Sequence, residues 1–151
     1  MSIFDPATFM DMGTSEANST QAPICEPGEY PGVVDKVEPK VITSKKDGRD
    51  FVILEVTWKL QNPEFEKTFG RQPTVRQSLF LDMNGNSLDT SKGKNVPLGK
   101  LREALSLNKP GQQFKFNMLL GAGPAKIFVK HNPDRNSPDV MRAEVTAVGK
   151  M

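Results

Sequence analysis

The sequence is poor in the residues that form disulfides and metal sites. Among its 151 residues there is one cysteine, Cys25, and one histidine, His131. A single cysteine excludes an intramolecular disulfide, and these two residues cannot supply the four ligands of a structural zinc site. No run reaches the roughly 18 apolar residues of a membrane span, and no basic region followed by an apolar run marks the N-terminus for export. We therefore expect no metal, no cofactor, no membrane association and a cytoplasmic location.

Catalytic signatures are also scarce. No serine or cysteine lies in a nucleophile motif, and His131 falls at the expected end of a strand without a partner for acid–base work. Cys25 falls in a segment that we expect to be flexible, where a perturbed thiol is not favoured. The basic loop Lys92–Asn95 contains a glycine but lacks the spacing of a phosphate-binding loop. The sequence thus predicts a binding protein and no enzyme.

The charges are distributed unevenly along the chain. Residues 1–29 hold five acidic residues and no basic ones, a net charge of −5, whereas the other 20 basic and 13 acidic residues give the rest +7. Residues 13–21 are polar and without periodicity, which is typical of a linker. We predict a flexible acidic leader over residues 1–25 and one folded domain over residues 26–151. A basic body favours a polyanionic partner, although the asymmetry is equally expected from solubility alone.

The hydrophobic pattern predicts an all-β fold with one short helix. Alternating residues indicate strands over 30–37, 51–60, 75–81, 114–120, 125–131 and 141–148, and Trp58 lies on the apolar face of the second. A helix begins near Pro97 and buries Leu98, Leu101 and Ala104. Three strands, a helix and then the remaining strands form the order of a five- to six-stranded Greek-key barrel of the oligonucleotide/oligosaccharide-binding (OB) type, with the helix between strands three and four.

Basic and aromatic side chains share faces of several predicted strands. Single-stranded nucleic acid offers phosphates and unstacked bases, and proteins bind both by interleaving cations with aromatic rings. Each such residue also has an ordinary interpretation, since Phe128 is as easily explained by packing as by base stacking. The candidate nucleic-acid-binding residues are Lys45, Lys46, Arg49, Phe51, Arg76, Phe80, Lys126, Phe128 and Lys130.

Three segments resemble a known family. The runs VRQSLFLD (75–82), KGKNVPLGKLREALSLNKPGQQFKFNMLLG (92–121) and AKIFVKHNPD (125–134) are similar to small phage-encoded single-stranded DNA-binding proteins of the OB type. The resemblance covers roughly residues 28–150. It implies a replication or recombination accessory that coats single-stranded DNA in the host cytoplasm, and it leaves homo-oligomerisation open.

The family resemblance also bears on the two ends of the chain. Bacterial single-stranded DNA-binding proteins usually end in an acidic, hydrophobic tip that recruits replication partners, whereas this sequence ends in Val148-Gly149-Lys150-Met151. We expect the acidic leader to serve instead, by docking on replication or recombination proteins or by competing with DNA at low salt.

One alternative from another class fits the same pattern. A structural or assembly module built on a β-barrel would show the same strands and an exposed apolar edge, and its leader would act as an arm exchanged between subunits. Salt dependence separates the two functions, because phosphate binding weakens steeply as salt rises and an apolar interface does not. A reader of duplex DNA is disfavoured, since the leucines of the predicted helix are committed to packing.

Overall fold

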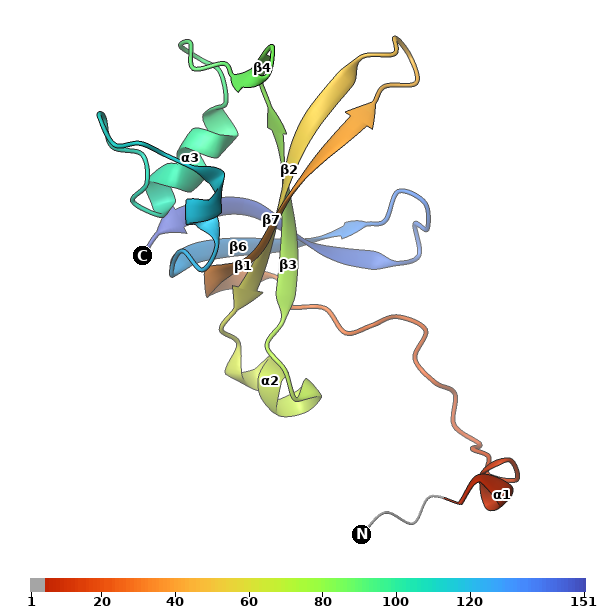
Figure 1. Cartoon of the computed structure of the whole chain (residues 1–151). Helices are drawn as coiled ribbons and strands as arrows, with labels where there is room; N and C mark the ends of the chain where they lie inside the picture. The colour runs from red at the N-terminus through yellow and green to blue at the C-terminus, as the bar shows by residue number, and fades with distance from the viewer. Residues whose placement is uncertain (1–4) are drawn as a thin grey trace.

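A closed five-stranded barrel forms the centre of the computed structural model, which describes residues 5–151. Around the barrel the strands follow the order β1-β2-β3-β7-β6, and β6 pairs back to β1 (Figure 1). All neighbours are antiparallel except β3 and β7, which are parallel. This confirms the predicted mostly-β, barrel-like fold. The barrel strands are β1 (Gly28–Thr43), β2 (Asp50–Leu60), β3 (Thr74–Leu81), β6 (Ala125–Pro133) and β7 (Met141–Lys150).

Short elements fill the connections between the barrel strands. The described chain has three α-helices where the sequence predicted one: α1 (Pro6–Phe9), α2 (Pro63–Phe69) and α3 (Val96–Ala104). Helix α2 begins at a recognisable cap, because the Asn62 Oδ1 accepts a hydrogen bond from the Phe65 N–H at 3.2 Å. It ends at Gly70, whose φ of 75° lies in the left-handed region. A two-stranded hairpin, β4 (Met83–Asn84) with β5 (Ser87–Leu88), follows β3.

The strand predicted over residues 114–120 is wrong. That segment is a loop followed by the 3-10 helix η1 (Phe116–Leu119). Phe114 and Phe116 are half-buried against the core, and Leu119 is fully buried, so burial alternates at first as it would in a strand. The barrel closes without this segment, however, and therefore leaves it no neighbour for strand pairing.

Strand β1 is longer than the sequence predicted. We expected it to end by Pro39, yet it continues to Thr43 and keeps Pro39 opposite Leu54 of β2. The pairing of β1 with β6 covers only residues 28–32, so from residue 36 onward β1 pairs with β2 alone. Proline is tolerated there because an edge strand need not donate on its free side. The β1–β2 hairpin therefore projects beyond the barrel (Figure 1).

The interior of the barrel follows the predicted alternation of β2. Leu54, Val56, Trp58 and Leu60 are buried, and the Trp58 Nε1–H donates to the Gln77 Oε1 at 3.0 Å. The indole thus contributes a large apolar area without leaving a buried donor unsatisfied. Helix α3 packs against β3 and β7 and buries its predicted apolar positions, Leu98, Leu101 and Ala104.

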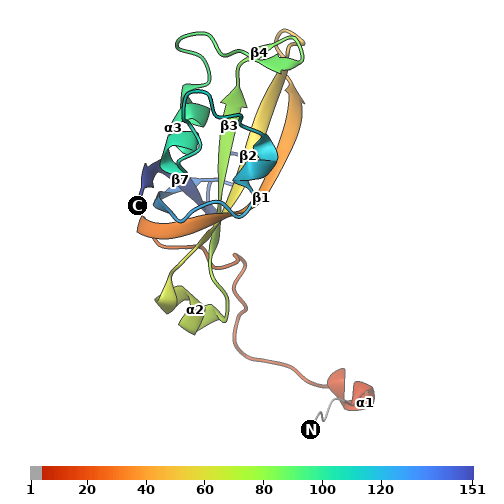
Figure 2. The same ribbon diagram turned by 60° about the vertical axis from the view of Figure 1, so that its left-hand side comes forward.

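The beginning of the folded body lies earlier than predicted. Residues 5–23 are exposed, and α1 lies apart from the barrel in two views (Figures 1 and 2). Cys25, which we expected in the flexible leader, is instead fully buried in the core. The His131 Nε2–H donates to the Cys25 carbonyl oxygen at 2.7 Å, and the Asn62 amide donates to the Cys25 sulfur at 3.7 Å. Burial raises the pKa of this thiol, so Cys25 is a packing residue.

Candidate nucleic-acid interface

One side of the barrel carries both cations and aromatic rings. Side chains that are paired across neighbouring strands lie on the same face of a sheet. Ile53 of β2 lies opposite Phe80 of β3 on one side and opposite Lys40 of β1 on the other. Two residues further along β2, Glu55 lies opposite Ser78 of β3 and Glu38 of β1. The outward side chains of the three strands therefore form one surface, called the outer face. Its residues are Lys36, Glu38, Lys40, Ile42, Phe51, Ile53, Glu55, Thr57, Arg76, Ser78 and Phe80.

Two exposed rings mark the part of the outer face nearest the β1–β2 turn. Phe51 and Phe80 pack edge to face with their centroids 6.4 Å apart, and their side chains are 41% and 63% exposed. Ile53, the cross-strand partner of Phe80, is buried on the same face. Aromatic rings on a water-facing surface are suited to stacking on unpaired bases.

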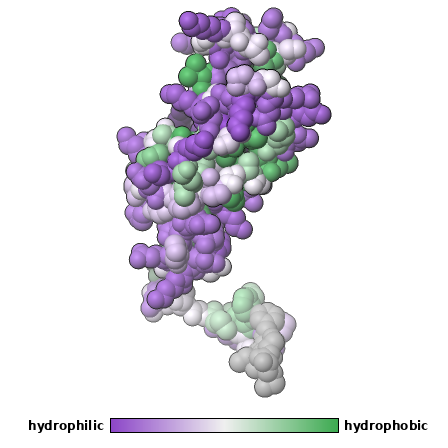
Figure 3. Space-filling model, turned by 90° about the vertical axis from the view of Figure 1, so that its left-hand side faces the viewer, coloured by the Kyte–Doolittle hydropathy of each residue, from purple (hydrophilic) through white to green (hydrophobic). Residues whose placement is uncertain are grey.

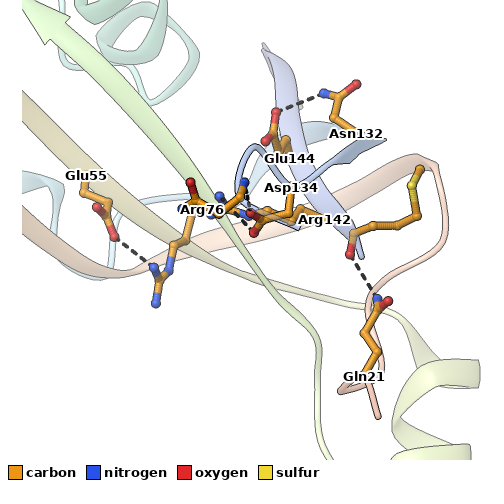
Figure 4. A network of polar contacts seen from close by, with 9 residues as sticks. Gln21, Glu55, Arg76, Asn132, Asp134, Arg142 and Glu144 are labelled. Carbon is orange, nitrogen blue, oxygen red and sulfur yellow. Dashed lines mark hydrogen bonds and ion pairs between the residues drawn. The ribbon is translucent and has the colours of Figure 1, made fainter. Parts of the chain in front are cut away.

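A carboxylate lies between two cations of the outer face. The Glu55 carboxylate is 3.0 Å from the Lys40 Nζ and 3.5 Å from the Arg76 Nη1. Figure 4 shows the contact between Glu55 and Arg76. The hydrogen bond from Lys40, aided by the charges of Lys40 and Arg76, holds the pKa of Glu55 below its usual value. Any anion that approached Lys40 and Arg76 would therefore have to compete with the Glu55 carboxylate for both cations.

The turn between β1 and β2 carries the remaining cations at this end. Lys45, Lys46 and Arg49 are all exposed, and hydrogen bonds between Ser44 and Arg49 and between Gly48 and Ser44, of 2.8 and 3.0 Å, close the turn. Phe51 lies two residues after Arg49. The turn therefore extends the outer face with three exposed positive charges.

The structure does not bring all the predicted site residues together. Lys126, Phe128 and Lys130 lie on β6, which pairs with β1 and β7 and not with β2 or β3. Phe128 is half-buried and packs near Gly149, while the Lys126 Nζ is 4.0 Å from the Glu29 carboxylate. The basic and aromatic residues are thus divided between two sides of the barrel. Strand adjacency depends on barrel closure, which periodicity does not reveal.

Sequence reasoning missed part of the outer face. Lys36 and Lys40 were not among the candidates. Lys36 lies within the predicted first strand but was not assigned to a basic and aromatic face, and Lys40 lies beyond Pro39, which was expected to end that strand or mark an edge. The signal was present, since Val37, Pro39 and Val41 alternate with Glu38, Lys40 and Ile42.

Acidic groups border the outer face on the β7 side. Glu144 pairs with Arg76 across the parallel β3–β7 contact and accepts a hydrogen bond from the Asn132 amide at 2.9 Å. The Asp134 carboxylate lies 3.9 Å from Arg142 (Figure 4). These carboxylates place negative charge on the β7 side of the outer face, and Arg142 offsets one of them.

No protein family matches the chain, and no curated protein matches its sequence. Over residues 5–151, no group of three or more His, Cys, Asp or Glu side chains is arranged to hold a metal ion. In the same part of the chain, no helix has the length and apolar character to cross a membrane.

Proposed function

We propose that this protein is an OB-type barrel that binds single-stranded DNA with little sequence preference. Two features of its topology support the OB assignment. The closed barrel has the order β1-β2-β3-β7-β6 with a single parallel contact between its third and last strands, and α3 precedes the fourth barrel strand in the chain. In OB barrels the exposed side of strands two and three, with the adjoining loops, receives the ligand.

The observation that carries the proposal is the pair of exposed rings beside cations. Phe51 and Phe80 would each stack on a base, while Lys40, Arg76 and the turn cations would contact phosphates. Stacking stabilises a complex by about 1–3 kcal/mol per base whatever the base, which accounts for sequence tolerance. The β6 residues Lys126, Phe128 and Lys130 would belong to a separate side of the barrel and would not share this strand path.

The biological setting follows from the family resemblance of the sequence. We propose a phage-encoded replication or recombination accessory, without enzymatic activity, that acts in the host cytoplasm. Its acidic leader would be available to replication or recombination proteins, because residues 5–23 are exposed outside the barrel. The accessory role and the docking of the leader on replication or recombination proteins both rest on single-stranded DNA binding.

Fluorescence anisotropy tests the proposal directly. The full chain is titrated against labelled oligo-dT, oligo-rU and duplex DNA of equal length across a salt series. We expect tight binding to the single strand, weak binding to the duplex and a steep fall in affinity with salt. Equal affinity for duplex and single strand, or no binding at low salt, would refute the proposal.

Charge variants locate the path of the phosphates. Lys45→Ala and Lys46→Ala should each lower the slope of log affinity against log salt by about 0.7, the value for one single-strand phosphate contact. Lys130→Ala is the matched control, since it removes an exposed lysine from β6. Glu55→Gln should tighten binding, because it frees Lys40 and Arg76 from a competing carboxylate. A control as damaging as the turn variants would place the path elsewhere.

A protein-interaction module remains the second candidate, and one feature favours it. An apolar groove of about 390 Å³ opens beside the projecting β1–β2 hairpin. Soluble proteins commonly use such a groove for a ligand or a partner. Association that persists at high salt, without nucleic-acid binding, would support this function.

A further inference from the structure

The apolar groove adjoins the barrel interior, because its lining includes the core residue Leu54 together with Val37 and Leu81, which pack against the core. It is bounded by the β1–β2 hairpin, the end of β3, the β4–β5 hairpin and η1, and its volume is about 390 Å³. Leu120, at its edge, is 55% exposed. The groove therefore presents apolar surface to water at the end of the molecule that carries the β1–β2 turn. Residues that line it include Val37, Pro39, Val52, Leu81, Met83 and Leu120.

The leader of the same chain offers apolar side chains of the complementary kind. Met10 and Met12 are 82% and 73% exposed, and they alternate with Asp11 just after α1. Figure 3 shows hydrophobic side chains on this detached segment and others on the barrel above it. Methionine is flexible and polarizable, so it fills irregular apolar grooves well. The leader is thus suited to a groove rather than to a flat surface.

Charge also favours contact between leader and body. Residues 1–25 contain three acidic residues and no basic ones, a net −3, whereas residues 26–151 contain 20 basic and 15 acidic residues, a net +5. Opposite charges on two surfaces accelerate their encounter and favour the correct pairing. Lys115 lies next to Phe116 of the groove lining and is exposed.

The leader and the groove lie at opposite ends of β3. The Gln21 amide donates to the Met141 carbonyl at 3.0 Å, which holds the end of the leader close to the start of β7, next to Thr74 at the start of β3. The groove begins at Leu81, the last residue of β3. Seven residue steps separate Thr74 from Leu81, so at about 3.3 Å per residue these two ends are about 23 Å apart. In Figures 1 and 2 the leader also extends away from the end that carries the groove.

We propose that residues 5–12 of one molecule bind the apolar groove of a second copy. Such a contact joins two different surfaces, so copies assemble head to tail, into a ring where the rotation closes and into an open-ended chain where it does not. A segment this short buries less than the roughly 1,200 Å² of a stable interface, so each contact is weak. The inference goes beyond the proposed function and does not depend on it.

Sedimentation of the full chain without nucleic acid tests the inference. Protein from about 1 μM to about 1 mM covers the range of weak association. The leader variant carries Met10→Ser with Met12→Ser, and the groove variant carries Leu120→Asp. Their matched controls are Ala17→Ser with Asn18→Ser in the exposed linker, and Val96→Asp, an exposed apolar residue of α3 that does not line the groove.

The expected outcome is specific to a head-to-tail contact. The average mass of the wild type and of both controls should rise with concentration beyond that of a dimer, whereas each variant alone should remain a monomer. An equimolar mixture of the leader and groove variants should stop at a dimer, because it contains one intact leader and one intact groove per pair.

Several results would overturn the inference. A wild type that stays monomeric throughout would do so, including the case in which the leader binds the groove of its own molecule. Variants that associate like the wild type, or a mixture that stays monomeric, would also refute it. The leader variant changes no residue of the folded body, so its result does not depend on the fold. DNA binding is measured separately by anisotropy, so its failure is distinguishable from failure of the association.

Discussion

Replacing Phe80 by alanine is the sharpest test of the outer face. Loss of one stacking platform should weaken binding to oligo-dT by about 1–3 kcal/mol, which corresponds to about 5- to 150-fold in Kd. Phe80 is 63% exposed, so only about a third of its apolar area is buried in the folded protein, and the mutation removes only that buried part. With about 1.5–3 kcal/mol for a fully buried phenylalanine, the free energy of unfolding should fall by only about 1 kcal/mol.

Phe128→Ala is the matched control for this experiment, because it removes the same ring from β6. We expect it to leave Kd nearly unchanged and to cost at least as much stability, since Phe128 is half-buried. Anisotropy at fixed salt measures Kd, and urea unfolding of each variant measures stability. If Phe128→Ala weakened binding while Phe80→Ala did not, the outer face would not be the site, and the β6 face would take its place.

Three further predictions concern the folded body. Gly32→Ala should lower the free energy of unfolding by about 1–3 kcal/mol, because the added Cβ would lie 2.8 and 2.9 Å from two core side chains. The control Gly99→Ala, in α3, adds a Cβ that meets nothing within 4 Å and should raise the free energy of unfolding by about 0.5–1 kcal/mol. Equal effects of the two variants in urea unfolding would contradict this packing. Lys40 lowers the pKa of Glu55, so the ion pair stabilises the folded state above the ordinary pKa of 4.5, and this stabilisation is lost as pH falls through the lower pKa of the folded state. The free energies of unfolding of the wild type and Glu55→Gln should therefore converge in acid. A difference between them that stays constant with pH would refute the ion pair. Cys25 should react with a thiol reagent far more slowly in the native protein than in urea, because burial removes access and raises its pKa, and rapid native labelling would contradict its place in the core.

Much of the barrel could be predicted because its signal is local. Strands β2 and β3 each have one face in the core, and a period of two shows directly in their residues. The core tryptophan and the buried face of α3 were predicted for the same reason. The end of β1 was missed at Pro39, since tolerance of proline depends on which edge of the strand is free. The strand expected at 114–120 failed because alternation alone cannot supply a pairing partner.

The sequence by itself determined which side chains of β2 and α3 face inward, where the basic turn lies and how acidic the leader is. These are properties of neighbouring residues. Only the tertiary structure decided that Phe51 and Phe80 meet, that Lys40 joins them, and that Phe128 lies on another side of the barrel. It also decided that Cys25 is buried. Each of these outcomes depends on strand pairing and barrel closure between segments distant in the chain, and no local pattern encodes that pairing.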